Sequence, residues 1–386
     1  MTTNSLLRHI NALRCLRVLR KGVPLSRADI GRELGITRAT VGNSINPLLS
    51  EGLVIESEDQ GQGGRAGRPG VLVALNPSGA YFIGLDISTT AINAVLIDFT
   101  MRIVAKQTLS IRDCYRDALR VIDLLAELPR QLIETARVRN KQIRGLCVSI
   151  PGIVKGGCVV SAPWLGWQDV DLRELLSKQL KVRWSIEVCN DAVALASAVR
   201  AEAGESEMQD VLLILLAQGI GSAHIRQGRI VEGAHGFAGE IGHMVMGARA
   251  KLAASHTFEI LAGYERFRPF IPTGQSISEG LVTLAQLDQP GPDLGNLLEE
   301  WGAVLAAGLL NLVHIFDPQN IVLGGPLAVL YPRVEKYVRD ELASYLVHGF
   351  KVPPISVTSY GADSAAIGAA ALVRETLFAL PELAPS

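Results

Sequence analysis

Two short stretches of this 386-residue sequence combine residue types that can bind a hydroxylated ligand. The first is Val188-Cys189-Asn190-Asp191, and the second is the Gly-rich stretch 236–243, which carries Glu240 and His243. Carboxylates accept hydrogen bonds from hydroxyl groups, whereas amides and imidazoles can both donate and accept them. A carboxylate aimed at a hydroxyl can also act as a general base. The two stretches therefore indicate a sugar-like ligand, or chemistry on one of its hydroxyl groups.

The local sequence predicts the elements that position these groups. Residues 188–190 are typical of a strand end, and residues 192–196 favour a helix immediately after Asp191. The glycines of 236–243 favour a loop. A simpler interpretation is that Asn190 and Asp191 only cap the helix, and the residues alone leave both interpretations open.

A helix-turn-helix is predicted within the first fifty residues. Leucine and isoleucine recur at helical spacing over residues 6–19, between arginines. Ser26 can cap a second helix that runs to about residue 34. Gly35 supplies a left-handed turn, and Thr37 can cap a third helix. In this arrangement the later helix enters the major groove of DNA.

Two predicted strands, 53–56 and 71–75, flank a stretch rich in glycine and arginine, 60–69. Arginines on such a loop suit phosphates or a narrow minor groove, so we interpret it as a wing; a plain linker has the same composition. We therefore predict a winged helix-turn-helix DNA-binding domain over residues 1–75. Its candidate DNA contacts are Thr37, Arg38, Thr40, Asn43, Ser44, Arg65 and Arg68.

Charge supports this division. Residues 1–70 carry 10 Lys or Arg against 6 Asp or Glu, and the remainder carries 27 against 32. A basic head on an acidic body suggests a nucleic-acid contact, although an ordinary solvated surface can show the same imbalance. The sequence has no apolar run of about 18 residues and no secretory signal, so we expect no membrane span. Five scattered cysteines predict free thiols in a reducing cytoplasm.

Residues 76–386 predict a two-lobed body. A lobe of about 80–188 plus the C-terminal helix, and a second lobe of about 189–360, each begin with strands and resemble the sugar-kinase/actin fold. Ligands favour clefts between such lobes. The predicted strands are 81–86, 91–97, 103–108, 146–150, 211–215, 222–225, 320–325 and 354–359, and the predicted helices are 115–138, 292–316 and 364–378.

Nearly the whole chain resembles the ROK family of repressors, open reading frames and sugar kinases. The two opening stretches match its patterns E-N-D-A-N-A-A and G-x-x-G-E-I-G-H, and 149–152, 162–167 and 361–370 match further motifs. Residues 26–42 resemble the helix-turn-helix of the ROK repressors. Gly42-Asn43 replaces the usual Ser-Arg, and Pro47 is expected to kink the third helix or to free a carbonyl near Asn43.

The resemblance implies a set of sugar-binding residues. They are Asn190, Asp191, Glu240, His243 and Glu259.

The same resemblance argues against phosphoryl transfer. The kinase loop D-x-G-G-T-K is Asp86-Ile87-Ser88-Thr89-Thr90-Ala91 here, so two glycines have gained side chains and the lysine is lost. The second loop, G-T-G-I-G in the kinases, is 217–221, with Gln218 in place of threonine. Pro326 replaces a glycine in a third turn and removes an N–H donor. We expect no kinase activity; because Asp86 and Asp191 are retained, a weak kinase stays open.

The family's usual zinc-binding cysteines are missing. The stretch C-x-C-G-x-x-G-C-L-E of relatives corresponds to 250–259, which contains no cysteine. His243 and His256 alone cannot complete a tetrahedral zinc site, so we expect no structural zinc and no other cofactor.

These observations predict a cytoplasmic, sugar-responsive transcriptional regulator of α/β fold, most simply a repressor of carbohydrate uptake or catabolism genes. Its expected partners are operator DNA, a sugar or sugar-phosphate effector, and further copies of itself in a homodimer or homotetramer. The alternatives are a bifunctional sugar kinase with a DNA-binding head, and a regulator controlled by a protein partner.

Overall fold

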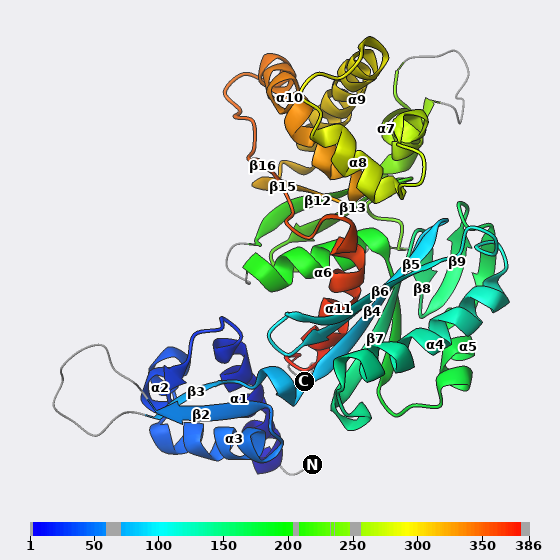
Figure 1. Ribbon diagram of the computed structural model, residues 1–386. Coiled ribbons are helices and arrows are strands. Elements are labelled where there is room, and N and C mark those ends of the chain that lie inside the picture. Colours follow the sequence, from blue (N-terminus) through cyan, green and yellow to red (C-terminus); the bar gives the residue numbers. More distant parts are fainter. Residues whose placement is uncertain are drawn as a thin grey trace.

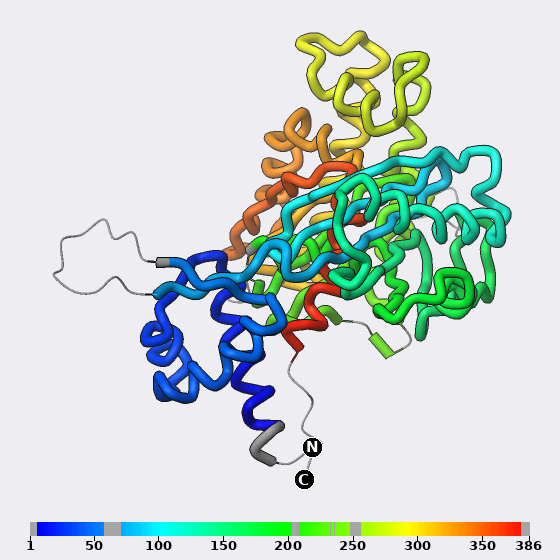
Figure 2. The backbone as a smooth tube through the Cα atoms, turned by 60° about the horizontal axis from the view of Figure 1, so that its bottom comes forward, coloured from blue at the N-terminus to red at the C-terminus, as the bar shows by residue number. Residues whose placement is uncertain are grey.

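The structure, a computed structural model, describes residues 3–58, 71–203, 208–231, 233–234, 236–247 and 256–379. They form an N-terminal head, residues 3–75, and a larger body built of two lobes (Figure 1). The first lobe holds one five-stranded sheet and the second lobe holds another. The head lies beside the first lobe, close to the end of the last helix (Figure 2).

Three helices and a three-stranded sheet make up the head. They are α1 (Thr3–Leu19), α2 (Arg27–Leu34) and α3 (Arg38–Ser50), with β1 (Leu25–Ser26), β2 (Val54–Glu58) and β3 (Val71–Leu75) in the order β1-β3-β2. The predicted helices are confirmed, and so are their caps. The Ser26 hydroxyl accepts from the Asp29 N–H at 3.1 Å, Gly35 is left-handed with φ 66°, and the Thr37 hydroxyl accepts from the Thr40 N–H at 3.2 Å.

The first lobe is built on a sheet with the strand order β11-β7-β4-β5-β6. Its strands are β4 (Tyr81–Ile87), β5 (Ala91–Asp98), β6 (Ile103–Ser110), β7 (Ile143–Ile150) and β11 (Ser185–Asn190). The helices α4 (Ala118–Ala136) and α11 (Ser364–Thr376) pack against this sheet, and α5 (Leu172–Leu180) lies beside α4. A small sheet of β8 (Ile153–Lys155), β9 (Cys158–Ala162) and β10 (Trp167–Val170) extends the lobe towards the cleft.

The second lobe repeats this plan with the order β14-β13-β12-β15-β16. Each sheet has three antiparallel strands followed by two parallel ones, as the predicted tandem of similar lobes requires. The strands are β12 (Asp210–Leu216), β13 (Ile220–Arg226), β14 (Arg229–Ile230), β15 (Asn320–Gly324) and β16 (Ile355–Val357). The helices are α7 (Phe258–Ala262), α8 (Ile277–Ala285), α9 (Pro292–Phe316) and α10 (Tyr331–Tyr345).

Helix α6 (Asp191–Ala203) joins the two lobes. It packs against β12 and β13 of the second lobe and against α11 of the first. The two helices approach closely because Gly368 has no side chain, and an added methyl group there would clash with the Ala194 carbonyl. Gly84 of β4 likewise admits the backbone of α11 at Ala366. The lobes therefore meet along the pair α6 and α11, seen in the centre of Figure 1.

One described helix, α9, is long and apolar enough to cross a membrane by length and composition. Its Leu305, Leu309 and Leu312 are fully buried, in the same hydrophobic core as residues of β12 and α10. Such burial is typical of the core helix of a globular lobe. All five cysteines are free thiols, as expected.

Candidate functional site

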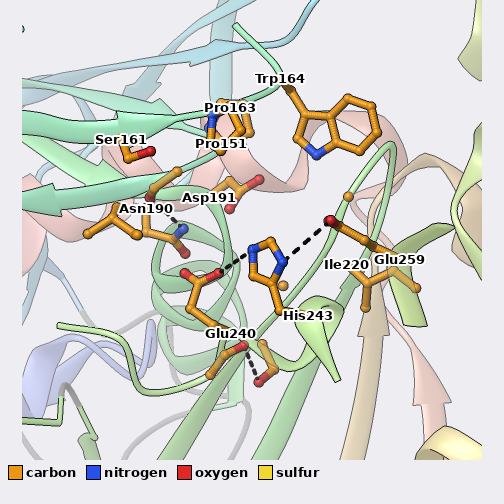
Figure 3. A pocket seen from close by; sticks show the side chains of 16 residues that line it. Pro151, Ser161, Pro163, Trp164, Asn190, Asp191, Ile220, Glu240, His243 and Glu259 are labelled. Carbon is orange, nitrogen blue, oxygen red and sulfur yellow. Dashed lines mark hydrogen bonds and ion pairs between the residues drawn. The ribbon is translucent and has the colours of Figure 1, made fainter. Parts of the chain in front are cut away.

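A pocket of about 340 Å³ opens between the two lobes, at the beginning of α6 (Figure 3). Its volume lies at the lower end of the range for small-ligand sites, which suits a monosaccharide. The first lobe contributes Pro151, Gly152, Ile153, Ser161, Pro163 and Trp164, α6 and the residue before it contribute Asp191 and Asn190, and the second lobe contributes Gly219–Ser222, Gly239, Glu240, His243 and Glu259. All five residues predicted for the sugar therefore line one pocket.

Asn190 acts as a helix cap within this pocket. Its side-chain oxygen accepts from the backbone N–H groups of Ala192 at 2.8 Å and Val193 at 3.3 Å. Its side-chain nitrogen donates to the Gly152 carbonyl at 2.9 Å. The helix-cap interpretation therefore holds for Asn190, and its amide joins α6 to a loop of the first lobe.

Asp191 occupies the first position of α6 and carries the strongest electrostatic perturbation in the pocket. Burial, reinforced by the charges of Asp86 and Glu240, raises the pKa of Asp191 to about 8. Burial also raises the pKa of Asp86, on β4, to about 7, although the Ser149 hydroxyl donates to it at 2.9 Å. At neutral pH Asp191 thus carries a proton much of the time, so it can both donate to and accept from a hydroxyl group.

The remaining predicted groups lie around His243, in a short 3₁₀ turn, Ile241–His243. Its Nε2 is 3.8 Å from Glu240 Oε2, and its Nδ1 is 3.6 Å from Glu259 Oε1. Burial and the charge of Glu259 raise the pKa of Glu240, whereas His243 opposes that shift. Glu259 is held near the pocket by α7, whose first turn contains it. The predicted loop 236–243 thus brings an imidazole between two carboxylates.

A second cavity, of about 500 Å³, adjoins the pocket and shares Pro151, Trp164, Asp191 and Gly219 with it. The predicted remnants of the phosphate loops line it. Beside it the Thr89 hydroxyl donates to Oε1 of the lining residue Gln218 at 2.7 Å, and Gln218 Nε2 donates to Glu265 Oε1 at 3.0 Å. Thr89 belongs to the first lobe and Gln218 to the second, so this hydrogen bond bridges the lobes.

The residues predicted to contact DNA differ in their exposure to solvent. Thr37, Arg38 and Asn43 are exposed at the N-terminal part of α3, and Thr40 is half-buried. The prediction that Ser44 contacts DNA is corrected, because Ser44 is 1% exposed and its hydroxyl donates to the Thr40 carbonyl at 2.9 Å. It therefore faces the core of the head. Arg65 and Arg68 lie outside the described residues.

Pro47 does not end the third helix. It lies inside α3, which continues to Ser50. Pro47 has no backbone N–H that could donate to the carbonyl of Asn43. A free carbonyl at Asn43 therefore stays a prediction.

The described residues contain no group of three or more His, Cys, Asp or Glu that could hold a metal ion. Residues 250–255, most of the stretch 250–259 that corresponds to the zinc-binding stretch of the resemblance, lie outside them. The absence of structural zinc thus stays a prediction.

Trp164 was not assigned a role from the sequence. It lies in the loop between β9 and β10, half-buried, and lines both cavities. The sequence feature that could have indicated a role for Trp164 is its place directly after Pro163 in a short loop. A large side chain at such a position seldom reaches a core. The bond between Thr89 and Gln218 was also missed.

The described fold and site define a two-lobed sugar-kinase-like body with a helix-turn-helix head. The ROK family model matches residues 82–260 and 279–376. The chain therefore belongs to the ROK family.

Individual relatives match nearly the full length. The xylose repressor of Bacillus spizizenii is 26% identical over 379 residues, covering 95% of each chain. A solved ROK family transcriptional regulator, a homologue of the Escherichia coli MLC protein, has a TM-score of 0.75 at 20% identity and covers 96% of this chain and 97% of its own. A ROK glucokinase from Streptomyces griseus, solved with glucose and AMPPNP, has a TM-score of 0.65 at 21% identity, covering 77% of this chain and 100% of its own. These two structures establish the likeness of fold alone.

Proposed function

We propose that this chain is a sugar-responsive transcriptional regulator, most simply a repressor of carbohydrate uptake or catabolism genes. Residues 1–75 would bind operator DNA, and the pocket between the lobes of residues 76–386 would bind a sugar or sugar-phosphate effector. The observation that carries the proposal is the convergence of Asp191, Glu240, His243 and Glu259 on one monosaccharide-sized pocket. The full-length similarity to a xylose repressor supports the same assignment.

The head supports the proposed binding of operator DNA. Thr37, Arg38 and Asn43 lie exposed at the start of α3, where a recognition helix contacts base edges and phosphates. Operators of such proteins are two-fold symmetric, so the chain would act as a homodimer or homotetramer in the cytoplasm.

The alternative, a bifunctional sugar kinase, is disfavoured by the second cavity. In ROK kinases the two loops that carry Thr89 and Gln218 face the phosphates of ATP, whereas here their side chains bond to each other at 2.7 Å. Phosphoryl transfer depends on backbone donors and cations placed around those phosphates. We therefore propose that the chain does not phosphorylate sugars, although Asp86 and Asp191 remain in place.

One experiment with two readouts separates the candidates. Double-stranded DNA selected from a random library by the full chain is titrated by fluorescence anisotropy, with and without each member of a sugar panel, and ATP consumption is followed in parallel. We expect one sugar to change DNA affinity by about 5- to 150-fold, in either direction, without ATP turnover. Failure to select DNA, or sugar-dependent turnover at about 1 per second or faster, would favour the kinase.

A further inference from the structure

This inference rests on the proposed sugar-binding function. The charge of the pocket then restricts which class of sugar can bind there. Its lining carries the carboxyl groups of Asp191, Glu240 and Glu259. Among the described lining residues there is no lysine or arginine, and the imidazole of His243 lies between two of the carboxylates. A phosphate carries up to two negative charges and needs cations or several N–H donors to replace its water. Hydroxyl groups, by contrast, are well matched to carboxyl groups.

Trp164 adds an apolar wall to the pocket. Figure 3 shows its indole at the side contributed by the first lobe, opposite His243 and Glu259 of the second lobe. The indole reaches the backbone of the second lobe, because a methyl group added at Gly219 would lie 3.2 Å from Trp164 Nε1. An aromatic face with a few convergent polar groups is the usual lining of a small-ligand site. Here it is suited to the C–H face of a sugar ring.

The same indole stands where the pocket meets the second cavity. Trp164 and Asp191 line both spaces, and Asp86 lines the second. A phosphate on a hydroxyl that faces Asp191 would therefore lie beside the indole and two carboxyl groups. Lys106, which also lines the second cavity, is paired with Asp363 at 3.3 Å.

From this arrangement we infer that the effector is an uncharged sugar whose ring stacks on Trp164, and that the pocket excludes the corresponding sugar phosphates.

Matched pairs of probes test this inference. Isothermal titration of the full chain would compare D-glucose, D-mannose and N-acetyl-D-glucosamine with their 6-phosphates, and would include D-xylose and L-arabinose. We expect at least one neutral sugar to bind, and any related phosphate to bind at least about tenfold more weakly. A phosphate that binds more tightly than its neutral partner would overturn the inference and would mean that a cation outside the described residues reaches the ligand.

Variants of Trp164 test the stacking. Trp164→Ala should weaken binding of the neutral sugar by about tenfold, whereas Trp164→Phe, which keeps an aromatic face, should remain within about threefold. Trp184→Phe, in the first lobe and remote from the pocket, is the control and should bind as wild type does. Equal affinity in Trp164→Ala and wild type would contradict the stacking. If no sugar of either class binds a chain that still binds DNA, the proposed function fails, and this inference fails with it.

Discussion

Asn190 and Asp191 are neighbours with different roles. The side-chain oxygen of Asn190 accepts from two backbone N–H groups of α6, and its nitrogen uses one of its two N–H groups to donate to the Gly152 carbonyl. The side chain of Asp191 accepts from the backbone N–H of Ala192, at 2.9 Å, and from its own backbone N–H, and no described side chain donates to it. A ligand hydroxyl can therefore reach Asp191 more readily than Asn190. The sequence motif alone could not separate the two, because both residue types cap helices.

The raised pKa of Asp191 makes the stability of the chain depend on pH. In the folded state its pKa is about 8, against an ordinary value of 3.8, so the folded chain holds a proton that the unfolded chain releases. The free energy of unfolding therefore falls as pH rises between about 4 and 8. Asp191→Asn removes this group's titration and keeps an acceptor for the Ala192 N–H. We expect the variant to be more stable than wild type at pH 8.5, by on the order of 2 kcal/mol, and nearly equal to it at pH 4.

Chemical denaturation across this pH range measures the difference. The charge of Asp86 acts on Asp191, so the difference between the two proteins also includes the coupling between these two carboxyl groups. Asp123→Asn, which changes an exposed carboxylate of α4, should run parallel to wild type. Parallel curves for Asp191→Asn as well would show that Asp191 is ionised and solvated in the folded chain.

Three helices, α1, α6 and α11, meet between the head and the body. Arg20, just after α1, forms an ion pair with Glu375 of α11 at 2.7 Å, and these side chains are only 9% and 14% exposed. Arg20 also donates to the carbonyl of Arg200, in the last turn of α6, at 3.4 Å. Arg17 of α1 donates to the Phe378 carbonyl, just beyond α11, at 2.8 Å. The head is thus attached to both helices along which the lobes meet.

This arrangement predicts that Arg20 transmits the state of the pocket to the head. Helix α6 begins at Asp191 and ends beside Arg20, so rotation of the lobes would shift α6 relative to α11 under the head. Arg20→Lys can keep the ion pair with Glu375 but cannot form two separate bonds through a guanidinium. We expect Arg20→Lys to keep the DNA affinity of the sugar-free protein and to lose most of the sugar-induced change.

The measurement is a DNA titration with and without sugar. Lys21→Ala, which breaks an exposed pair with Glu33 inside the head, is the control and should respond to sugar as wild type does. An unaltered sugar response in Arg20→Lys would show that the head senses the lobes through other contacts.

Sequence reasoning was most successful where an element carries its own start and stop signals. Ser26, Gly35 and Thr37 delimit α2 and the start of α3 through local hydrogen bonds, so those limits are visible in the sequence. The two-residue strand β1 and the small sheet β8–β10 were missed, because strands this short contain too few residues to show an alternation. The helices α5, α7, α8 and α10 were also not predicted.

The site was predictable only in part, for a related reason. Motifs identified the residues of the pocket, but not which of their atoms remain available to a ligand. The bond between Thr89 and Gln218 joins residues 129 positions apart, and it depends on how the lobes are rotated. Local sequence carries no information on that rotation.

In the whole molecule, the two lobes of similar plan place the pocket between them, so a change in their relative orientation would change the pocket. Its lining comes from both lobes and from the start of α6. A ligand that contacts both lobes favours the arrangement in which all its contacts are made, and it can shift the protein only by its difference in affinity for the two arrangements. The Thr89–Gln218 bond stabilises one such arrangement.

We propose that a sugar bound at Asp191 controls DNA binding by a head that the sugar does not touch. The direct measurement is an anisotropy titration of selected operator DNA with wild type, Asp191→Ala and the exposed-site control Asp123→Ala, over increasing concentrations of the sugar found by the panel. Removing one partner of a buried hydrogen bond costs roughly 1–3 kcal/mol, so Asp191→Ala should need about 5- to 150-fold more sugar. Its DNA affinity without sugar should equal that of wild type and the control. If Asp191→Ala responds at the wild-type sugar concentration, the effector binds elsewhere and Asp191 does not contact it.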